Sequence, residues 1–214
     1  MNSQQKCPLC SKLGFFSQVT NLKRVFHRCP SCDLLFVDPS QILSQEEEKK
    51  RYESHNNDIE DIRYQDFLRP LFRVILEAVP KNSKGLDFGA GPGPALSEML
   101  KKKDFEIELY DPFFWPNENA LNTQYDFVFA SEVVEHFSNP NREFRLLRSL
   151  LKPKGKLFLM TLLYGPEIDL TQWYYLKDPT HICAYSKNTF NWIQSNFGFT
   201  KTKVQEPRIV SLFA

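Results

Sequence analysis

A glycine-rich segment in the middle of the chain constrains the fold more than any other feature. Residues 86–95 read Leu-Asp-Phe-Gly-Ala-Gly-Pro-Gly-Pro-Ala, so Asp87 is followed by Gly89, Gly91 and Gly93. A strand-like run precedes this segment and a helix-like run follows it. Because glycine permits positive φ and lets a backbone approach a ligand closely, we expect a strand, a tight ligand-binding loop and a helix. A tight turn that binds nothing is the alternative.

Strand-like and helix-like runs alternate after this point. The expected strands are 85–88, 105–110, 125–130 and 156–163, and the expected helices are 94–102, 140–151 and 187–197. Two further runs, 199–206 and 208–213, are typical of a terminal hairpin. The pattern predicts an α/β fold that is Rossmann-like, with a mostly parallel sheet, helices on both faces and a C-terminal antiparallel hairpin.

The length of 214 residues suffices for one full domain and a small module. We expect residues 1–40 to form the module, residues 41–80 a helical linker or cap, and residues 81–214 the α/β domain. The second helix of the cap should end before Pro80, because proline cannot continue it.

Four of the five cysteines form two C-x-x-C pairs, Cys7 with Cys10 and Cys29 with Cys32, and 18 residues separate the pairs. This spacing predicts a structural zinc ribbon in which four thiolates close a tetrahedral shell. A module this small cannot bury enough core, so the metal would supply folding free energy. Two disulfides are one alternative. His27 as a replacement ligand is another, although we expect His27 at the surface.

The charge distribution excludes a strongly basic nucleic-acid binder. The net charge of the whole chain is +1, although residues 1–36 carry five basic residues against Asp33 alone. The basic module could dock a phosphate-bearing partner such as nucleic acid, but we favour an ordinary solvated surface. No stretch is apolar enough to span a membrane and no signal region follows Met1, so a cytoplasmic protein is expected.

Two prolines decide which cofactor the glycine loop suits. Pyrophosphate recognition uses backbone N–H groups at a helix N-terminus, and Pro92 and Pro94 remove two of them. S-adenosylmethionine carries no phosphate, and Asp87 could serve its ammonium group. Asp111, 24 residues further on, is placed to accept hydrogen bonds from ribose hydroxyls. A turn cap before Pro112 is the alternative role for Asp111.

Four motifs together resemble class I S-adenosylmethionine-dependent methyltransferases. The motifs are Asp87-Phe-Gly-Ala-Gly-Pro-Gly, Asp111, Tyr125-Asp-Phe-Val-Phe-Ala-Ser-Glu-Val-Val-Glu-His-Phe and Leu151-Lys-Pro-Lys-Gly-Lys-Leu. The resemblance covers residues 81–214 and is greatest to the branch that includes the ubiquinone-pathway O-methyltransferases. The segment Trp173…Asp178-Pro-Thr-His181…Tyr185-Ser is similar to one in uncharacterised bacterial members. Several members of the family also carry an N-terminal zinc ribbon.

The chain departs from the family where the adenine should be held. Only residues 112–124 separate Asp111 from the next strand. The family has a helix and a third strand in this interval, and the third strand ends in an acidic residue that contacts the adenine amino group. A crossover helix by itself needs about a dozen residues, so we expect the third strand to be missing. Phe113, Phe114 or Trp115 could stack on the base instead, or could simply pack.

The motifs and the resemblance give a set of expected cofactor-binding residues. This set is Asp87, Gly89, Ala90, Gly91, Gly93, Asp111, Pro112, Phe113, Ser131 and Glu132. The resemblance implies that Glu132 lies near the methionine tail of the cofactor and that His136 lies on the acceptor side.

The expected catalytic residues are Glu135, His136 and His181. Because Glu132, Glu135 and His136 have i, i+3, i+4 spacing, a helix would gather them on one face. There they could hold a divalent metal, orient substrate or form an internal ion pair. His181, which Asp178 could orient, is our preferred general base, and a histidine that ties a loop to the core is the alternative.

Two further segments are expected to close the site. Residues 164–186 are long for a connection in a compact domain, so we expect them to form a lid or a substrate wall. Tyr52 and His55, in the polar break before the second helix of the cap, could close over the cofactor.

These features leave four functions to compare. The favoured one is an S-adenosylmethionine-dependent methyltransferase that acts on a small-molecule acceptor, with oxygen the favoured acceptor atom. The second is an RNA or protein methyltransferase docked through the zinc ribbon. The third is a non-catalytic binding module with a degenerate cofactor site. The fourth, a nicotinamide oxidoreductase, is disfavoured by Pro92 and Pro94.

Overall fold

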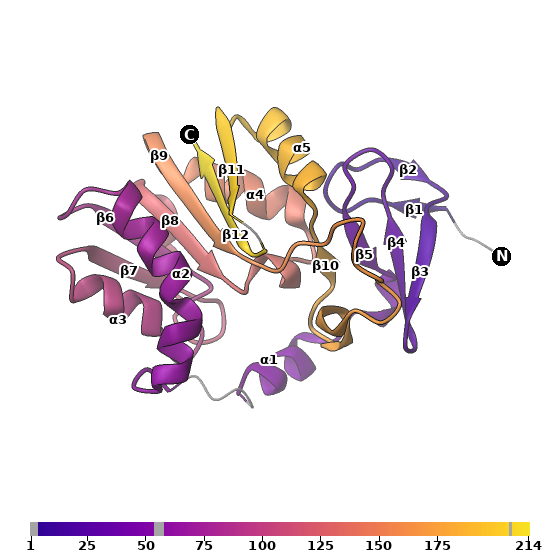
Figure 1. The fold of residues 1–214 in the computed structure, drawn as a ribbon, viewed down its shortest axis with the longest axis horizontal. Helices are drawn as coiled ribbons and strands as arrows, with labels where there is room; N and C mark the ends of the chain where they lie inside the picture. The colour runs from indigo at the N-terminus through magenta and orange to yellow at the C-terminus, as the bar shows by residue number, and fades with distance from the viewer. Residues whose placement is uncertain (1–3, 54–57, 206) are drawn as a thin grey trace.

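The computed structural model describes residues 4–53, 58–205 and 207–214. A twisted sheet carries helices on both of its faces, and a small four-cysteine ribbon at the N-terminus lies beside one end of it (Figure 1). His55, which we expected near the cofactor, lies outside the described residues.

Six strands form the main sheet. They are β6 (Lys84–Phe88), β7 (Glu106–Tyr110), β8 (Tyr125–Ser131), β9 (Leu151–Met160), β11 (Lys201–Gln205) and β12 (Ile209–Phe213). Their order is β11-β12-β9-β8-β6-β7, and β7, β6, β8 and β9 run parallel whereas β12 and β11 are antiparallel. The predicted α/β fold with a mostly parallel sheet and a terminal hairpin is therefore confirmed.

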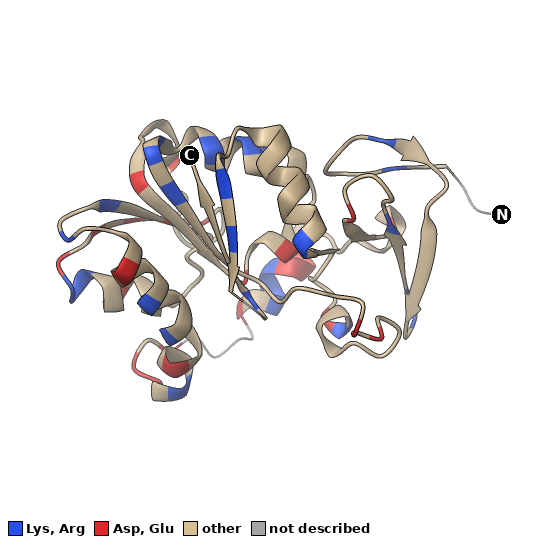
Figure 2. Ribbon diagram, turned by 45° about the horizontal axis from the view of Figure 1, so that its top comes forward, with Lys and Arg blue, Asp and Glu red and all other residues tan. Residues whose placement is uncertain are grey.

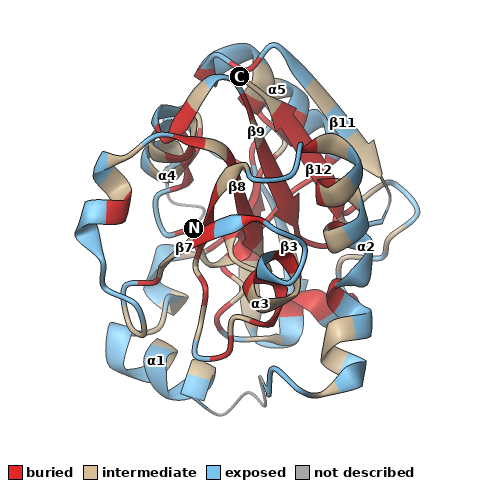
Figure 3. Ribbon diagram, turned by 90° about the vertical axis from the view of Figure 1, so that its left-hand side faces the viewer, coloured by how far each residue is buried: buried red, intermediate tan, exposed pale blue. Residues whose placement is uncertain are grey.

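Alternation along the central strands creates a core on each face of the sheet. On β8, Phe127 and Phe129 pack toward one core, and Val128 and Ala130 pack toward the other. Successive side chains of a strand point to opposite faces, so a strand covered on both sides is apolar throughout. The buried residues accordingly concentrate in β8, β9 and β12 and in the inner faces of the helices (Figure 3).

Four helices cover the two faces. They are α2 (Ile62–Ala78), α3 (Ala95–Lys101), α4 (Pro140–Ser149) and α5 (Lys187–Phe197). Residues of α2 and α3 belong to one core, and residues of α4 and α5 belong to the other. Local signals define helix ends: Ser186 and Thr189 form a capping box before α5, and Gly198 ends it with φ of 75°. Among the described residues, no helix is both long enough and apolar enough to cross a membrane.

The predicted strand over 156–163 had the wrong boundaries. Strand β9 begins five residues earlier and ends at Met160. Beyond that point Leu163 leaves the main sheet and forms an isolated bridge with Tyr185. Both residues are apolar because they are buried between the sheet and the ribbon, which sequence periodicity alone cannot distinguish from a continuing strand.

The N-terminal ribbon consists of short antiparallel strands. They are β1 (Gln5–Lys6), β2 (Leu13–Gly14), β3 (Ser17–Asn21), β4 (Arg24–Arg28) and β5 (Leu35–Val37). A 3₁₀ turn, Pro39–Gln41, and the polar helix α1 (Gln45–Glu53) then lead toward the main domain. His27 is only 2% exposed and its Nε2 lies 3.0 Å from Asp38 Oδ2, so the expectation of a surface histidine was wrong.

The ribbon is joined to the main domain through the segment 164–186. Strand β10 (Cys183–Ala184) of this segment pairs antiparallel with β5 and extends the ribbon sheet. The Arg24 guanidinium donates to the carbonyl oxygens of Leu176 at 3.0 Å, Asp178 at 2.6 Å and Pro179 at 3.1 Å. One side chain of the ribbon thus binds three backbone carbonyls of the segment that carries His181.

Two further ribbon side chains bind the same segment. Asn21 Nδ2 donates to the carbonyl oxygens of Leu170 at 2.7 Å and Trp173 at 3.0 Å. Asp33 Oδ2 accepts a hydrogen bond from Ser186 Oγ at 2.6 Å, at the start of α5. These bonds fix both ends of the long connection to the ribbon.

Two of the five basic residues of the ribbon are bound within the protein, whereas Lys6, Lys12 and Lys23 are exposed. Arg24 is occupied as described, and Arg28 Nε donates to Asp33 Oδ1 at 2.7 Å. Over the rest of the molecule, acidic and basic residues are interspersed (Figure 2). The two arginines are therefore not available to a partner, and the interpretation of the ribbon charge as an ordinary surface stays a prediction.

Candidate functional site

A cavity of about 700 Å³ opens at the carboxyl ends of β6, β7 and β8. Strand β6 has β7 on one side and β8 on the other, so the order of the strands reverses at this point. In open α/β sheets, ligands bind in the crevice outside the strand ends at such a reversal. The volume lies within the range of about 300–1,000 Å³ that is typical of small-molecule sites.

The glycine loop at the mouth of β6 needs its first glycine for two reasons. Gly89 has φ of +80°, and a Cβ on it would lie 2.7 Å from both Cγ atoms of Val133. Gly91 has φ of +61°, where larger residues are strained. The spacing of these glycines therefore follows from the backbone path of the loop.

The N–H groups of this loop are already used within the protein. Those of residues 89 and 90 donate to the carbonyl of Tyr110, at 2.8 and 3.1 Å, and that of Gly91 donates to Asp111 Oδ2 at 3.0 Å. Pro92 and Pro94 have no N–H to offer. The loop is therefore a poor phosphate site, in agreement with the inference from its prolines.

Asp111 holds the loop and the following turn together. Its Oδ1 accepts hydrogen bonds from the N–H groups of Phe113 and Phe114, at 2.8 and 3.0 Å. Trp115 Nε1 donates to the carbonyl of Gly91 at 2.7 Å, so the turn closes on the glycine loop. An ionised carboxylate has about four acceptor sites, and three are occupied, which leaves Asp111 room for about one ligand hydroxyl. Asp111 thus has the turn-capping role that we considered and still lines the cavity.

Residues 112–124, all of which the structure describes, contain no strand other than the isolated bridge at Trp115 and only one short 3₁₀ helix, Glu118–Asn122. The predicted loss of the third strand is confirmed. The cavity nevertheless reaches past Asp111 to Leu121 and α4.

Asp87 lies behind the glycine loop and does not line the cavity. It is 5% exposed, and Ser97 Oγ of α3 donates to its Oδ2 at 2.6 Å. Burial, together with the charge of Asp111, raises the pKa of Asp87 to about 7. A group in this position acts on a ligand through the loop or through water.

Tyr175 bridges the buried carboxyl of Glu135 and the partly buried carboxyl of Glu132. The Tyr175 hydroxyl donates to Glu135 Oε1 and lies 3.5 Å from Glu132 Oε2. Burial raises the pKa of each carboxyl to about 7, and the charge of Glu132 adds to the effect on Glu135. The Arg208 guanidinium lies 3.7 Å from Glu132.

Each acid of this pair has one buried oxygen, Glu132 Oε1 and Glu135 Oε2, that accepts no hydrogen bond from the described residues. Glu132 Oε1 is the oxygen that faces the Arg208 guanidinium at 3.7 Å, so it has an ion-pair contact although it has no hydrogen-bond donor. Leaving a buried carboxylate oxygen without a donor is unfavourable. The arrangement therefore suits a cationic ligand, or one that brings N–H or O–H donors.

His136 and His181 meet beside this acidic pair. Their ring centroids are 4.9 Å apart, and both residues line the cavity. His136 Nδ1 lies 2.9 Å from the Thr180 carbonyl and His181 Nδ1 lies 2.7 Å from the Tyr175 carbonyl. Because a carbonyl only accepts, Nδ1 carries the proton in both rings, and in the neutral ring Nε2 is the lone-pair atom.

These groups are brought together by tertiary structure and not by an α-helix. Only Val134–His136 is helical, as a single 3₁₀ turn, and Glu132 precedes it with φ of 53°. The predicted helical face for Glu132, Glu135 and His136 was therefore wrong. Instead, one ligand atom each from Glu135, His136 and His181 lies within 4.8 Å of the others. Such a set can hold a divalent cation or can act as a proton acceptor.

Helix α1 lines the cavity on the side of His136. The Tyr52 ring lies 5.3 Å from the His136 ring and 6.0 Å from the Phe113 ring, and the Tyr52 hydroxyl donates to Glu48 at 2.6 Å. Arg51 binds Asp178 at 2.7 Å, which connects α1 to the segment of His181. The structure therefore brings Tyr52 to the site, as we expected.

The four cysteine sulfurs lie within 4.8 Å of one another, and all four thiols are free of disulfides. The Cys7–Cys32 and Cys10–Cys29 sulfur distances are both 3.5 Å. Tetrahedral zinc with Zn–S bonds of about 2.3 Å places sulfurs about 3.8 Å apart, so this cluster fits the metal.

The structure divides the expected site residues into two groups. Those that line the cavity are Gly89, Asp111, Pro112, Phe113, Ser131, Glu132, His136 and His181. Those that do not line it are Asp87, Ala90, Gly91, Gly93 and Glu135. The sequence analysis missed lining residues on the helices and at the end of β7, among them Glu48, Tyr64, Tyr110, Arg142, Glu143 and Leu146. No local motif marks them, because only the packing of α1, α2 and α4 against the sheet brings them to the cavity.

Comparisons with known proteins agree on one enzyme class. A family model described as "Methyltransferase domain" matches residues 61–204. A search of curated proteins found no match.

Three solved structures are similar in fold. The 1,6-didemethyltoxoflavin-N1-methyltransferase of Burkholderia thailandensis, with bound 1,6-didemethyltoxoflavin and S-adenosylhomocysteine, has 12% identity, covers 91% of this chain and 96% of its own, and has a TM-score of 0.55. A SAM-dependent methyltransferase from Archaeoglobus fulgidus has 18% identity and a TM-score of 0.54, and the similarity covers 70% of this chain and 93% of that protein. An O-methyltransferase family protein from B. thailandensis has 14% identity and a TM-score of 0.54. The similarity covers 78% of this chain but only 62% of that protein, less than two thirds of its length.

The raised pKa of Asp87 predicts that the unliganded protein loses stability as the pH rises. The neutral carboxyl is favoured in the folded state, so the stabilising contribution is present at low pH and is lost as the pH rises toward about 7. Between pH 5 and pH 8, one such group accounts for roughly 2–3 kcal/mol. Asp87→Asn should remove this share of the decline, as measured by urea unfolding at pH 5 and pH 8.

Asp126→Asn is the matched control. Although burial opposes the shift, the Lys152 ammonium and the N–H of Lys84 lower the pKa of Asp126, so this substitution should not flatten the decline. Equal slopes for wild type and Asp87→Asn would contradict the raised pKa.

Proposed function

The chain belongs to the methyltransferase domain family, and we propose that it transfers a methyl group from S-adenosylmethionine to an oxygen of a small-molecule acceptor. The observation that supports this cofactor most is the state of the glycine loop. Its N–H groups at residues 89–91 are used internally and prolines follow them, so the loop suits a nucleoside without phosphates.

The acidic pair supports the same cofactor. S-adenosylmethionine carries an ammonium and a sulfonium, and the buried oxygens of Glu132 and Glu135 lack hydrogen-bond donors. We assign Glu132 to the ammonium of the methionine tail and Asp111 to a ribose hydroxyl. When bound, S-adenosylmethionine supplies an electrophilic methyl group on a good leaving group.

The work left to the protein is to align the acceptor and to remove its proton. In this proposal the acceptor hydroxyl lies between Tyr52 of α1 and the two histidines. Nε2 of His181 takes the proton, and the Tyr175 carbonyl fixes the tautomer that leaves Nε2 basic. Helix α1 and the wall formed by residues 164–186 exclude water from the reacting atoms.

A divalent cation held by Glu135, His136 and His181 is the alternative way to activate the acceptor. The clustering of their ligand atoms within 4.8 Å favours it, as does the orientation of both rings by backbone carbonyls. The cation would lower the pKa of a bound hydroxyl and so do the work that a free histidine base otherwise does.

The chemistry of the acceptor side supports a small, flat, uncharged acceptor. Aromatic rings of Tyr52 and Phe113 line it, and carboxylates outnumber cations there. In the similar B. thailandensis structure, a small heterocycle accompanies S-adenosylhomocysteine. An RNA or protein acceptor has less support, because Arg24 and Arg28 of the ribbon are already paired.

We further propose that the four cysteines bind structural zinc and that residues 1–40 form a zinc ribbon. In this division residues 41–80 act as a cap and residues 81–214 as the catalytic domain. The motif that begins at Tyr125 ends in Glu135-His136-Phe137, and this ending supports a relationship to the ubiquinone-pathway O-methyltransferases.

Calorimetric titration tests the cofactor. We expect micromolar binding of S-adenosylmethionine and S-adenosylhomocysteine and none of NAD. Glu132→Gln should weaken S-adenosylmethionine by about tenfold or more, because it removes the charge that faces the ammonium. Glu118→Gln, an exposed residue outside the cavity, is the control and should bind like wild type. Absence of binding by the wild-type protein would favour the non-catalytic binding module.

Replacement of His181 tests acceptor activation, with catechol and other small hydroxylated aromatic compounds as acceptors. His181→Gln retains a donor for the Tyr175 carbonyl but loses the base, and we expect kcat to fall about 100-fold or more while S-adenosylhomocysteine affinity changes less than threefold. Full activity in this variant would exclude His181 from the mechanism. Titration with Mn²⁺, followed by electron paramagnetic resonance, separates a free histidine base from a cation site. If Glu135, His136 and His181 form a cation site, the wild-type protein binds Mn²⁺ and His181→Gln does not. If His181 is a free base, neither protein binds the ion there.

A further inference from the structure

We infer that Glu143 of α4 recognises the amino group of adenine and takes the place of the acidic residue that a third strand would supply. This inference rests on the proposed function, because it assigns the adenine end of the same cofactor site. In this assignment Glu143 determines which nucleoside the site accepts.

The cavity beyond Asp111 has the shape and chemistry of a base site. Tyr110, Leu121, Phe137 and Leu146 line this end, and Glu143 brings a carboxylate to it. Apolar walls suit the two faces of a flat ring, and a single polar group can then read its edge. Burial raises the pKa of the Tyr110 hydroxyl, and the charges of Glu143, Asp111 and Glu118 add to the effect, with that of Glu143 the largest of the three.

The carboxylate of Glu143 has unused acceptor capacity. Its side chain is 21% exposed, and its ion-pair contact is Arg142 Nε at 3.6 Å, which is too long for a hydrogen bond. Among the residues that the structure describes, none donates a hydrogen bond to this carboxylate. A partly buried carboxylate without donors gains stability when a ligand supplies an N–H.

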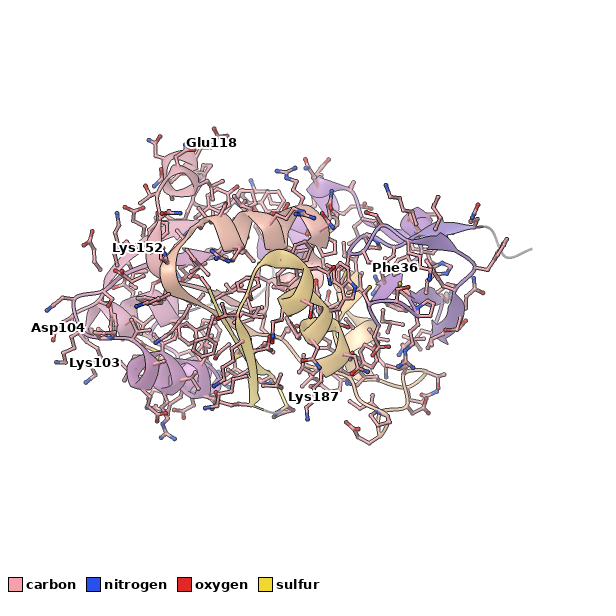
Figure 4. All side chains as sticks on the ribbon, turned by 90° about the horizontal axis from the view of Figure 1, so that it is seen from above. Phe36, Lys103, Asp104, Glu118, Lys152 and Lys187 are labelled. Atoms are coloured by element: carbon pink, nitrogen blue, oxygen red, sulfur yellow. The ribbon has the colours of Figure 1, made fainter. Side chains whose placement is uncertain are left out.

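The segment that replaces the third strand does not supply an acid of its own. Glu118 is the acidic residue within 112–124, and it is exposed and does not line the cavity. Figure 4 shows Glu118 at the outer margin of the molecule, far from Phe36 of the ribbon. The same short segment turns Leu121 toward the cavity, so it contributes an apolar wall there and leaves the polar contact to α4.

The chemistry of the base follows from this geometry. The adenine amino group is a hydrogen-bond donor that a carboxylate accepts. Hypoxanthine has a carbonyl oxygen at the same position, and its lone pairs would face the carboxylate of Glu143 without a proton between them. A polar site built for a donor rejects an analogue that presents an acceptor.

The test compares the binding of S-adenosylhomocysteine and S-inosylhomocysteine by calorimetry. We expect wild type to prefer the adenosyl compound by about 100-fold, since a buried acceptor that loses its donor costs a factor of this order. In Glu143→Gln the preference should fall below about tenfold, because the side-chain amide can donate to the carbonyl of hypoxanthine. The substitution preserves size at a partly exposed position of a helix, so the fold should tolerate it.

Glu118→Gln is the matched control and should keep the wild-type preference. A Glu143→Gln protein that discriminates as strongly as wild type would overturn the assignment while leaving the cofactor in place. If wild type binds neither compound, the proposed function itself fails, and the assignment of Glu143 fails with it.

Discussion

The pairing of β5 with β10, reinforced by Arg24, is the interaction on which the His181 side of the cavity depends. It joins the N-terminal ribbon to the segment 164–186, which has little regular structure of its own. The two parts also share an apolar core, in which Phe26 and Leu35 of the ribbon belong with Trp173 and Tyr175 of the segment. The ribbon is thus part of the support of the site and not an appended module.

The ribbon affects Glu132, Glu135 and His181 through the segment 164–186. The segment carries Tyr175 and His181, and Tyr175 bridges the acids Glu132 and Glu135 while its carbonyl orients His181. Burial makes both acids hold their protons more tightly and leaves two oxygens without donors. A cation or a hydrogen-bond donor that reaches these oxygens would favour the ionised carboxyls, and this is consistent with the positively charged cofactor we propose.

The sequence predicted the fold well because its signals were local and repeated. The alternation of strand-like and helix-like runs predicted the sheet, the glycines predicted the loop, and the short stretch 112–124 predicted the missing strand. The prediction failed where distant segments decide the outcome. Glu132 has positive φ and joins Glu135 through Tyr175, 40 residues later in the chain. The packing of α4 brings Glu143 to the cavity, and no local sequence motif predicts this position.

Hydrogen–deuterium exchange of the full chain, with and without its metal, tests most directly whether the ribbon and the segment 164–186 unfold as one cooperative unit. The protein would first be shown to contain about one zinc per chain and then be treated with a zinc chelator. We predict that residues 164–186 lose protection together with residues 4–37, while β6 to β9 keep theirs. If the ribbon alone exchanges faster and residues 164–186 stay protected, the wall stands without the ribbon and the account is wrong.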